Sequence, residues 1–590
     1  MSALTAEDAT EWLLLANAPP PTDASLKETV QAYETKRYEE RQFANIQGQT
    51  LMDGRTLQFA PAYEDGYTSN TQAASLQRIR AVFLCGFVVY TGLLAHECSV
   101  AGVPSSRVVW ALDCCVALPA FIVGFGLTYV HYLNLERITC GVFFIVATVL
   151  IVKKPLLTTP GPVLPLMLLL IPIFGITRMR FVSSCALGTA ILLLYMTVQL
   201  FAAVYVAGAD PGREVMYQVF NYAIRVFGGM VSHYRQEVLR RRNYALQLPF
   251  AGLMGDDECV ASPAAFSKRS LLRPWSLSFR EAAIEAGFVR YWYLLDPLPF
   301  ENIHDPALHR GVFATVRYAL VSAVLAQVLL ALQDAKLLPA TVQAAAAVAR
   351  FGVVVPAYGL LAAAIFVLSR SFAARAAGPS VSLDSFLAQR VVDALVLNDR
   401  GGYVRSVQLL AGAAVLLHVA AMGVLVLVVH DHAPAWTDLY LMGLLNALLF
   451  VHRSGFRVRF LVATTTTGLA GGVFIGASWS MLAPPEWRAY AFYTGAVLVL
   501  GGLISHEEES LRRSFFILRA LRTVQFRHWL SSVVKVQSWM RAKLRSRLRR
   551  LRAAKAADPR LLPDAASTRL AQATKVGVYG QLVQVIAEVL

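Results

Sequence analysis

The sequence predicts an all-α, polytopic membrane protein with about 12 transmembrane helices. Of its 590 residues, 56% are hydrophobic and only 16% are charged. A soluble protein carries about a quarter charged residues. The apolar residues form blocks of roughly 15–25, the length that a helix needs to cross a hydrocarbon layer about 30 Å thick. This composition excludes a disordered scaffold and a small disulfide-stabilised domain.

The apolar blocks form two sets of six, separated by a polar stretch. We predict the first set at 81–97, 108–130, 138–152, 162–176, 181–206 and 213–232. We predict the second set at 315–333, 343–369, 406–430, 437–452, 457–480 and 489–504. The expected domains are an N-terminal segment 1–80, a first membrane module 81–232, a linker with a juxtamembrane helix 233–312, a second membrane module 313–504 and a basic helical tail 505–590.

Basic residues are distributed unevenly between the loops of the two membrane sides. With the N-terminus inside, the inside loops carry most arginines, including Arg178 and Arg180 in the first half and Arg457 and Arg459 in the second. The outside pair Lys153–Lys154 is the clear exception. Because basic residues mark cytoplasmic flanks, we expect both termini to be cytoplasmic. The formal net charge of +16 has the same explanation and does not point to nucleic acid as a partner.

Short sequence motifs, which we call words, recur in the same order in both halves. Their recurrence predicts a tandem duplication of a six-helix module. The first-half words are Leu57-x-Phe59, Tyr63-Glu64-Asp65-Gly66-Tyr67, Arg178-Met179-Arg180-Phe181, Gly228-Gly229-Met230-Val231-Ser232-His233 and Glu237-x-Leu239-Arg240-Arg241-x-x-Tyr244-x-Leu246. Their second-half counterparts are Leu277-x-Phe279, Ile284-Glu285-Ala286-Gly287-Phe288, Arg457-Val458-Arg459-Phe460, Gly501-Gly502-Leu503-Ile504-Ser505-His506 and Glu509-x-Leu511-Arg512-Arg513-x-x-Phe516-x-Leu518. The seven-residue spacing of the leucines in the last words is that of a coiled coil, so we expect these two helices to pair.

A module with these words resembles the membrane region of class III adenylyl and guanylyl cyclases. In that family the helix after the sixth span is similar to a transducer that leads into the catalytic domain. The resemblance therefore implies a transducer-like role for the helix that follows each Gly-Gly word. The residues concerned are Gly228, Gly229, His233, Glu237, Leu239 and Leu246, and Gly501, Gly502, His506, Glu509, Leu511 and Leu518.

The polar segments between and after the modules do not read as a cyclase domain. The resemblance implies a long domain with two metal-binding aspartates, whereas the stretches 233–312 and 505–590 lack an alternating βαβ pattern. The seven cysteines form no CxxC pair with metal-ligand spacing. We therefore assign no catalytic residue, expect no metal or cofactor, and expect that the chain is not an enzyme.

Polar residues inside predicted spans are the candidates for a site within the membrane, because burying them there is costly. They are Asp113, Asn221, Arg225 and His418, with Arg350 as a further ionisable residue. Asp113 and Arg225 could pair across the first module, with Asn221 one turn away. The pair is either a ligand or ion site or a structural ion pair, and Arg225 could also extend toward the interface.

Two further patterns concern helix packing and partners. Gly468, Gly472 and Gly476 form a small-residue ridge, which we expect to pack inside its module rather than in a dimer. In the tail, apolar residues at helical spacing alternate with arginine and lysine; they are Phe526, Leu530, Val533 and Trp539. Val536-Gln537-x-x-x-Arg541-Ala542 also resembles the front half of an IQ motif. Such a helix binds an anionic leaflet, which we favour, or calmodulin.

Three functions are compatible with these observations. A cyclase-like regulatory or receptor module without catalysis explains the duplicated charged helices, and we favour it. A secondary transporter also has two parallel six-helix halves, and Asp399-Arg400-Gly401-Gly402 faintly resembles the loop motif of the major facilitator family. A structural subunit, in a homodimer or a larger membrane complex, is the third.

Overall fold

The computed structural model describes most of the membrane region and part of the remainder. The described residues are 56–59, 61–101, 106–130, 134–157, 161–245, 271–292, 308–376, 400–453 and 456–557. Within them the chain forms 13 separate helices when helices joined by a π-helical turn are counted together. Leu272 and Phe279 form an isolated antiparallel bridge.

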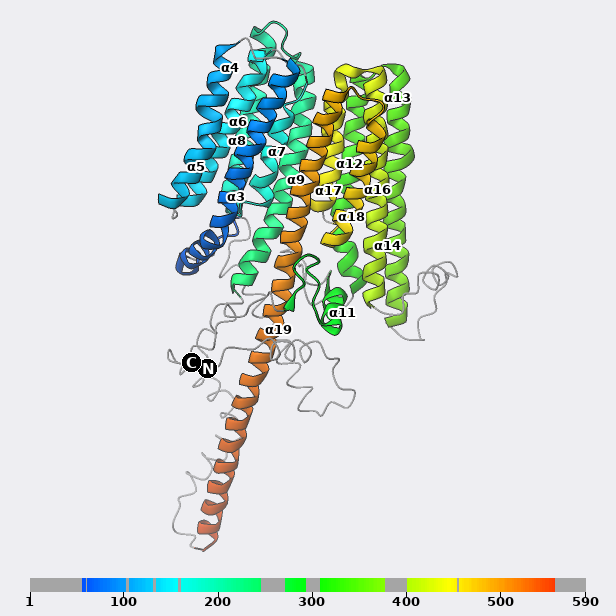
Figure 1. The fold of residues 1–590 in the computed structure, drawn as a ribbon. Helices are drawn as coiled ribbons and strands as arrows, with labels where there is room; N and C mark the ends of the chain where they lie inside the picture. The colour runs from blue at the N-terminus through cyan, green and yellow to red at the C-terminus, as the bar shows by residue number, and fades with distance from the viewer. Residues whose placement is uncertain are drawn as a thin grey trace.

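The first half contributes α3 to α9. The helices are α3 (Pro61–Ala101), α4 (Arg107–Ala111), α5 (Leu118–Val130), α6 (Leu135–Leu157), α7 (Leu164–Gly175), α8 (Phe181–Tyr205) and α9 (Gly212–Ala245). A π-helical turn, Leu112–Ala117, joins α4 to α5 without a break. Figure 1 shows α3 to α8 beside one another, with α9 on the side that faces the second half.

The second half contributes α11 to α19. The helices are α11 (Ala282–Tyr291), α12 (Leu308–Leu337), α13 (Ala340–Ala347), α14 (Val355–Ala376), α16 (Arg400–His432), α17 (Thr437–Arg453), α18 (Phe460–Ser478) and α19 (Pro484–Ala557). A second π-helical turn, Val348–Val354, joins α13 to α14. The short α11 lies at the lower end of the second half in Figure 1, level with the lower ends of α14 and α16. Pro484 can open α19 because proline has no N–H to lose in the first helical turn.

Ten of the described helices are long and apolar enough to cross a membrane, where the sequence predicts about 12. The predicted fourth block corresponds to α7, which has 12 residues and is buried from Leu166 to Gly175. At 1.5 Å per residue this helix is only about 18 Å long. The predicted sixth block is the first part of α9, which lies alongside the spanning helices but contains polar residues such as Asn221 and Arg225. The chain is an integral, multi-pass, all-helical membrane protein.

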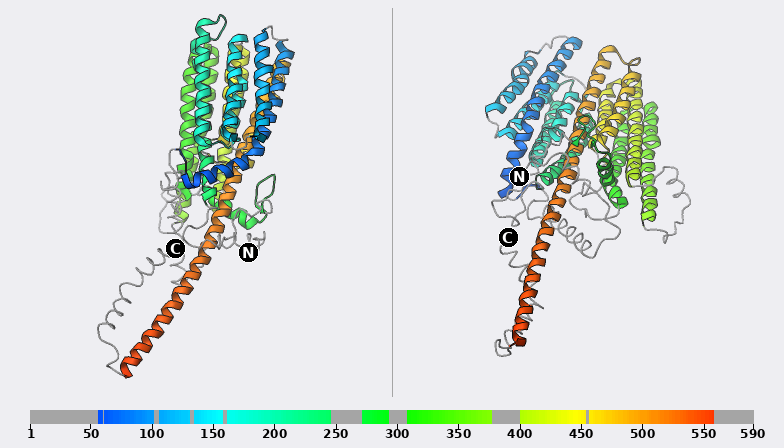
Figure 2. Two further views of the ribbon diagram at one scale, coloured as in Figure 1. Left: turned by 90° about the vertical axis from the view of Figure 1, so that its left-hand side faces the viewer. Right: turned by 60° about the horizontal axis from the view of Figure 1, so that its bottom comes forward.

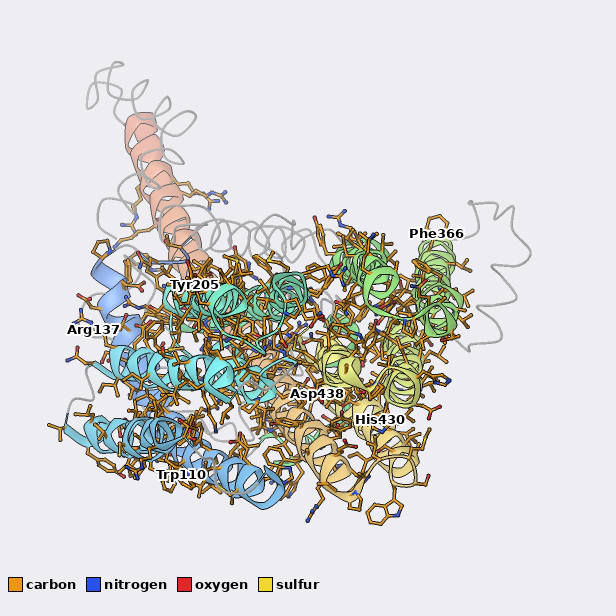
Figure 3. The ribbon with its side chains drawn as sticks, turned by 90° about the horizontal axis from the view of Figure 1, so that it is seen from above. Trp110, Arg137, Tyr205, Phe366, His430 and Asp438 are labelled. Carbon is orange, nitrogen blue, oxygen red and sulfur yellow. The ribbon has the colours of Figure 1, made fainter. Side chains whose placement is uncertain are left out.

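The two sets of helices stand side by side. We call α3 to α9 the first helix group and α12 to α19 the second. Where the groups meet, α9 contacts α17 and α19, and α7 contacts α19. Seen from above, Trp110 and Tyr205 mark the first group, and His430 and Asp438 mark the second (Figure 3). Exposed apolar side chains such as Phe201, Leu325 and Val473 cover the outside of the groups, which is the surface that a lipid bilayer favours.

One helix extends far beyond the rest. α19 is unbroken over 74 residues and leaves the helix groups at one end (Figures 1 and 2). We call this the arginine-rich end, because Arg240, Arg241, Arg512 and Arg513 lie there on α9 and α19. The sequence predicts such a continuation, since no helix breaker follows the Gly-Gly words.

Candidate functional site

Two charged clusters at the arginine-rich end form the candidate site. The first cluster joins the start of α3 to the end of α9, and the second joins α11 to the middle of α19. The first cluster consists of Phe59, Glu64, Tyr67, Glu237, Arg241 and Tyr244. The second cluster consists of Phe279, Glu285, Phe288, Glu509, Arg513 and Phe516.

Arg241 is the centre of the first cluster. Its Nη1 and Nη2 atoms donate to the two carboxylate oxygens of Glu64 at 2.7 and 3.0 Å, and its Nε donates to Glu237 at 2.8 Å. The guanidinium lies 4.2 Å from the ring centre of Tyr67, whose hydroxyl also donates to Glu237 at 3.0 Å. Arginine can bind a carboxylate with two parallel hydrogen bonds while it lies over an aromatic ring, whereas lysine cannot do both.

Arg513 occupies the corresponding place in the second cluster. Its Nη1 and Nη2 atoms donate to Glu285 at 2.7 and 3.1 Å, and its Nε donates to Glu509 at 3.0 Å. The guanidinium lies 4.2 Å from the ring centre of Phe288. Because Phe288 has no hydroxyl, Glu509 accepts instead from the backbone N–H of Phe460 at 2.8 Å. Glu509 thus accepts from Arg513, Arg459 and Phe460, whereas Glu237 accepts from Arg241 and Tyr67.

The backbone before each cluster has the same unusual form. Leu57 has φ = 61° and Leu277 has φ = 56°, in the left-handed region that bulky L-residues avoid. Two residues further on, the N–H of Phe59 donates to Glu64 at 2.7 Å and that of Phe279 donates to Glu285 at 2.8 Å. The same glutamate therefore holds the turn and the arginine.

Burial and charge act in opposite directions on the cluster glutamates. Burial raises the pKa of Glu237, but the positive charges of Arg240 and Arg241 outweigh it and hold this pKa below its ordinary value. Burial likewise raises the pKa of Glu285, but the hydrogen bond and charge of Arg513 hold it below its ordinary value. Both carboxylates are therefore ionised at neutral pH and keep the arginines in place.

The Arg-x-Arg loops lie next to the clusters. Arg178 and Arg457 have φ = 54° and 50°, and with Leu57 and Leu277 they are the four non-glycine residues of the described chain with positive φ. Arg180 bonds Glu136 at 2.7 Å, and Arg459 bonds Glu285 at 2.7 Å. Each loop turns sharply before the helix that follows, α8 or α18.

One glutamate links the two helix groups. Glu507 of α19 accepts from Arg78 of α3 at 2.6 Å and from the Nε of Arg178 at 2.8 Å. The side-chain amide of Asn243, on α9, donates to the backbone carbonyl of Leu511, on α19, at 3.1 Å. The ends of α9 and α19 therefore lie side by side, which places Leu239 and Leu511 on neighbouring helices. Leu518 is also buried, whereas Leu246 lies outside the described residues.

The glycine words are displaced by one residue from the alignment that the sequence suggested. A Cβ added to Gly229 would meet the ring of Phe174 at 2.5 Å, and one added to Gly501 would meet the ring of His452 at 2.6 Å. Gly228 has open space around it, and a Cβ at Gly502 would meet its nearest neighbour only at 3.8 Å. Gly229 and Gly501, the close-contact pair, are separated by as many residues as Glu237 and Glu509.

The two histidines of these words are held differently. His233 is buried, and its Nδ1 and Nε2 lie 3.0 and 2.9 Å from the carbonyl oxygens of Phe174 and Met179. His506 packs edge-on against Phe460. The two Ser-His pairs, although identical in sequence, therefore make different contacts.

The first helix group contains a buried ion network that the sequence did not predict. Asp113 does not pair with Arg225: it accepts from Tyr90 at 2.6 Å and lies 3.0 Å from Lys153, which also binds Glu97. Lys154 donates to Asp210 at 2.6 Å. Lys153 and Lys154 were the exception to the positive-inside pattern, and their pairing with carboxylates explains that exception.

The second helix group has a network of its own. Arg350 donates to Asp334 and to Gln327, the latter at 2.8 Å, and Tyr440 donates to Asp334 at 2.5 Å. His418, which the sequence singled out, lies between Gln327 at 3.2 Å and the hydroxyl of Tyr358 at 2.8 Å. Asn221 of α9 reaches this network by donating to Gln333 at 2.9 Å. The aspartate is the member that sequence reasoning missed, because Asp334 lies at the polar end of its block.

The two networks share one backbone feature. Asp113 lies in the π-helical turn Leu112–Ala117, and Arg350 lies in the π-helical turn Val348–Val354. Such turns are rare in proteins, and those that occur are often found at functional sites. Each widens the second long helix of its half at the residue whose charge is buried.

The remaining predicted positions are not brought to this site. Added Cβ atoms at Gly468, Gly472 and Gly476 would meet nothing, so the expected packing of this ridge inside its own half is wrong; Gly471 makes the close contact instead. Trp539 is exposed on the helical tail, whereas the side chains of Phe526, Leu530 and Val533 lie outside the described residues. Within the described parts of the chain, no group of three or more His, Cys, Asp or Glu side chains could hold a metal ion.

Comparison with known proteins does not add a family. No family model matches the chain, and neither a curated protein nor a solved structure matches it. The sequence and the structure together show a polytopic, all-helical membrane protein with ten candidate spans in its described residues.

Proposed function

We propose that this chain is a membrane regulatory or receptor module, similar to the membrane region of class III cyclases, that passes changes in helix packing to α9 and α19. The observation that carries this proposal is the placement of these two helices side by side, with Asn243 bonded to the backbone of Leu511. Each helix is held to its own half by a buried arginine, Arg241 or Arg513. A shift of either half therefore reaches the helix pair directly.

The proposal includes a tandem duplication of a six-helix module. The matched clusters, the four residues with positive φ and the two π-helical turns support it, because they fall at corresponding places in the two halves. On this view α7 and α9 count as the fourth and sixth helices of the first module. α7 is apolar but has only 12 residues, and α9 has 34 residues but carries buried polar side chains that its neighbours cover.

We infer that the arginine-rich end faces the cytoplasm. The positive-inside pattern supports this orientation, and exposed Trp479 packs on Trp487 at the opposite end, as in the aromatic belt of an interface. A cysteine placed at Ser546 should then be protected from an impermeant reagent in intact cells, and one at Ala483 should be labelled, in a chain without native cysteines. The reverse labelling would contradict the orientation.

A secondary transporter is the alternative that one observation favours. Buried ion networks lie beside a π-helical turn in each half, and such networks often mark substrate or proton pathways. However, transport by alternating access requires one half to move against the other. Hydrogen bonds join the halves at several levels, from Asn221–Gln333 through Arg225–Asn446 to Arg178–Glu507, and all must break in such a movement.

The proposed regulatory role is tested by cross-linking α9 to α19. In a chain without native cysteines, Asn243→Cys with Leu511→Cys should form an intramolecular disulfide on mild oxidation. The control pair is Phe227→Cys with Leu503→Cys, since both of these side chains are exposed and should not cross-link within one chain. Absence of the first cross-link in folded protein would show that the ends of α9 and α19 are not neighbours and would remove the proposed route for transduction.

We also propose that the chain has no cyclase activity of its own. The purified 590-residue chain should form no cyclic nucleotide from ATP or GTP with Mg²⁺ or Mn²⁺. Turnover above a mock preparation would show that a catalytic site had been missed.

A further inference from the structure

Two buried arginines lie where the helix groups meet. Arg225, in the middle of α9, is 2% exposed, and Arg453, the last residue of α17, is 6% exposed. Both reach the backbone of α7. Neither belongs to the clusters or the ion networks described above.

Both guanidinium groups have only neutral partners. Arg225 donates from Nε to the side-chain oxygen of Asn446 at 2.9 Å and from Nη1 to the carbonyl of Met167 at 2.9 Å. Arg453 donates from Nη1 to the carbonyl of Arg225 at 3.4 Å and from Nη2 to that of Ile171 at 3.2 Å. Within the described chain, Nη2 of Arg225 and Nε of Arg453 are buried and have no hydrogen-bond acceptor.

The buried cations of the two ion networks are different. Lys153 binds Glu97 and Asp113, Lys154 binds Asp210, and Arg350 binds Asp334. In contrast, no carboxylate of the described residues forms an ion pair with Arg225 or Arg453. Within the described residues, Arg225 and Arg453 therefore bring two positive charges to the interface without a carboxylate bound to either of them.

This excess of positive charge is costly. A guanidinium stays protonated in a protein, and moving it out of water without a counter-charge costs several kcal/mol. The C-terminal ends of α7 and α17 offset part of this cost for Arg453, because carbonyl groups there carry partial negative charge. Arg225 has no such help, since it lies in the interior of α9. Donors also exceed acceptors here: the amide Nδ2 of Asn446 has only a contact of 3.5 Å with the carbonyl of Asn221.

We propose that this interface binds a small monovalent anion of the size of chloride, held by Arg225 with Arg453 as the second positive charge. A small ion suits the close approach of α7 and α9, where an added Cβ on Gly229 would meet Phe174 at 2.5 Å. A single negative charge suits a site with few donors, because a divalent anion is harder to dehydrate. The bound ion stabilises the contact between the two helix groups. This inference does not depend on the proposed regulatory role.

The test is the thermal unfolding of the purified full-length chain in detergent. We compare sodium chloride with sodium gluconate at equal concentration, because gluconate is too large for the site. The midpoint should be higher in chloride by about 2–4 °C and should saturate with concentration, as expected for a ligand that binds only the folded state. Equal midpoints in the two salts for the unchanged chain would overturn the proposal, whatever the variants do.

Variants locate the effect. Arg225→Gln should abolish the difference between the salts and Arg453→Gln should reduce it, whereas Arg225→Lys should retain part of it. The control is Arg80→Gln, because Arg80 lies over the ring of Tyr129 on α5 rather than between the groups. A full chloride effect in folded Arg225→Gln protein would also overturn the proposal.

Discussion

Arg241 and Arg513 each hold two glutamates and an aromatic face, with ring distances of 4.2 Å in both halves. The ion networks inside the helix groups agree much less. The first contains two lysines and three carboxylates, and the second contains one arginine bound to one aspartate, with amide and tyrosine side chains around it. Only the place of the π-helical turn is the same.

This contrast distinguishes the contacts that are alike in the two halves from those that differ. Contacts that are alike in both halves lie at the arginine-rich end, where α9 and α19 meet, and contacts that differ lie within the membrane. We infer that the two halves deliver the same kind of movement to the helix pair but respond to different conditions in the membrane. The following changes test this separation, from the largest expected effect to the smallest.

Removing the central arginine of either cluster should cost the most stability. Arg241→Met and Arg513→Met each remove the central counter-charge of two glutamates, and loss of a buried ion-pair partner typically costs about 3–5 kcal/mol. Arg240 stays beside Glu237, and Arg459 stays beside Glu285. Because the two clusters make matched contacts, the two losses should agree within about 1 kcal/mol. Thermal or denaturant unfolding in detergent measures both. A large loss in one half alone would show that the clusters are not equivalent.

The ion networks should respond unequally to loss of an aspartate. Asp334→Asn removes the only carboxylate of the described residues that pairs with Arg350, whereas after Asp113→Asn the ammonium of Lys153 still binds Glu97. We expect a loss of about 3 kcal/mol for Asp334→Asn and about 1 kcal/mol for Asp113→Asn, since an uncompensated buried charge costs more than a weakened pair. The same unfolding measurement applies. Equal losses would contradict the difference drawn between the networks.

Acid should weaken both clusters together. The pKa values of Glu237 and Glu285 are lower in the folded chain than in the unfolded chain, where the pKa of glutamate is about 4.3. Their contribution to stability is therefore complete above that pH and is lost as the pH falls below it toward the folded-state values. The unfolding midpoint should fall steeply between about pH 5 and pH 3. Glu237→Gln and Glu285→Gln should each flatten this slope by a similar amount, and an unchanged slope would argue against the assigned pairs.

The tail should change binding rather than stability, since within the described residues only α19 continues far beyond its cluster. A peptide of residues 519–556 should bind anionic vesicles, or calmodulin with Ca²⁺, and release them at high salt. A matched peptide with Arg541, Arg545, Arg549 and Arg550 changed to Gln should bind more weakly. Figure 1 shows the tail pointing away from the helix groups, so binding to the leaflet of the same membrane requires a bend, whereas calmodulin does not. A peptide that binds neither would remove the partner proposal.

Periodicity and composition predicted the helical membrane fold well, because apolar blocks and arginine-rich loops report directly on the bilayer. They predict about 12 spans, whereas ten helices of the described residues qualify by length and hydropathy, since α7 is short and α9 is polar where other helices cover it. The ion pairs were not predictable, because the partner of Asp113 depends on which helices are neighbours. The sequence suggested Arg225, and the structure places Lys153 there.

The alignment of the Gly-Gly words shows that identical residues in two motifs need not occupy equivalent positions in the structure. Matching Gly-Gly to Gly-Gly placed Gly228 opposite Gly501, whereas the contacts match Gly229 with Gly501. On a helix, one residue is a rotation of about 100°, so a displacement of one exchanges a buried face for an exposed one. The signal that could have corrected the alignment is the charged word, in which Glu237 and Glu509 already have the right spacing.

The length of α19 has a mechanical consequence. From Arg513 to Ala557 the helix is unbroken, which at 1.5 Å per residue is about 65 Å of stiff rod beyond its anchor. A tilt of about 5° at the anchor would move the far end by about 6 Å, several times the displacement of the packed helices themselves. The anchor is Arg513, held between Glu285 and Glu509. Small rearrangements around the guanidinium of Arg513 would thus produce large movements of the far end of α19.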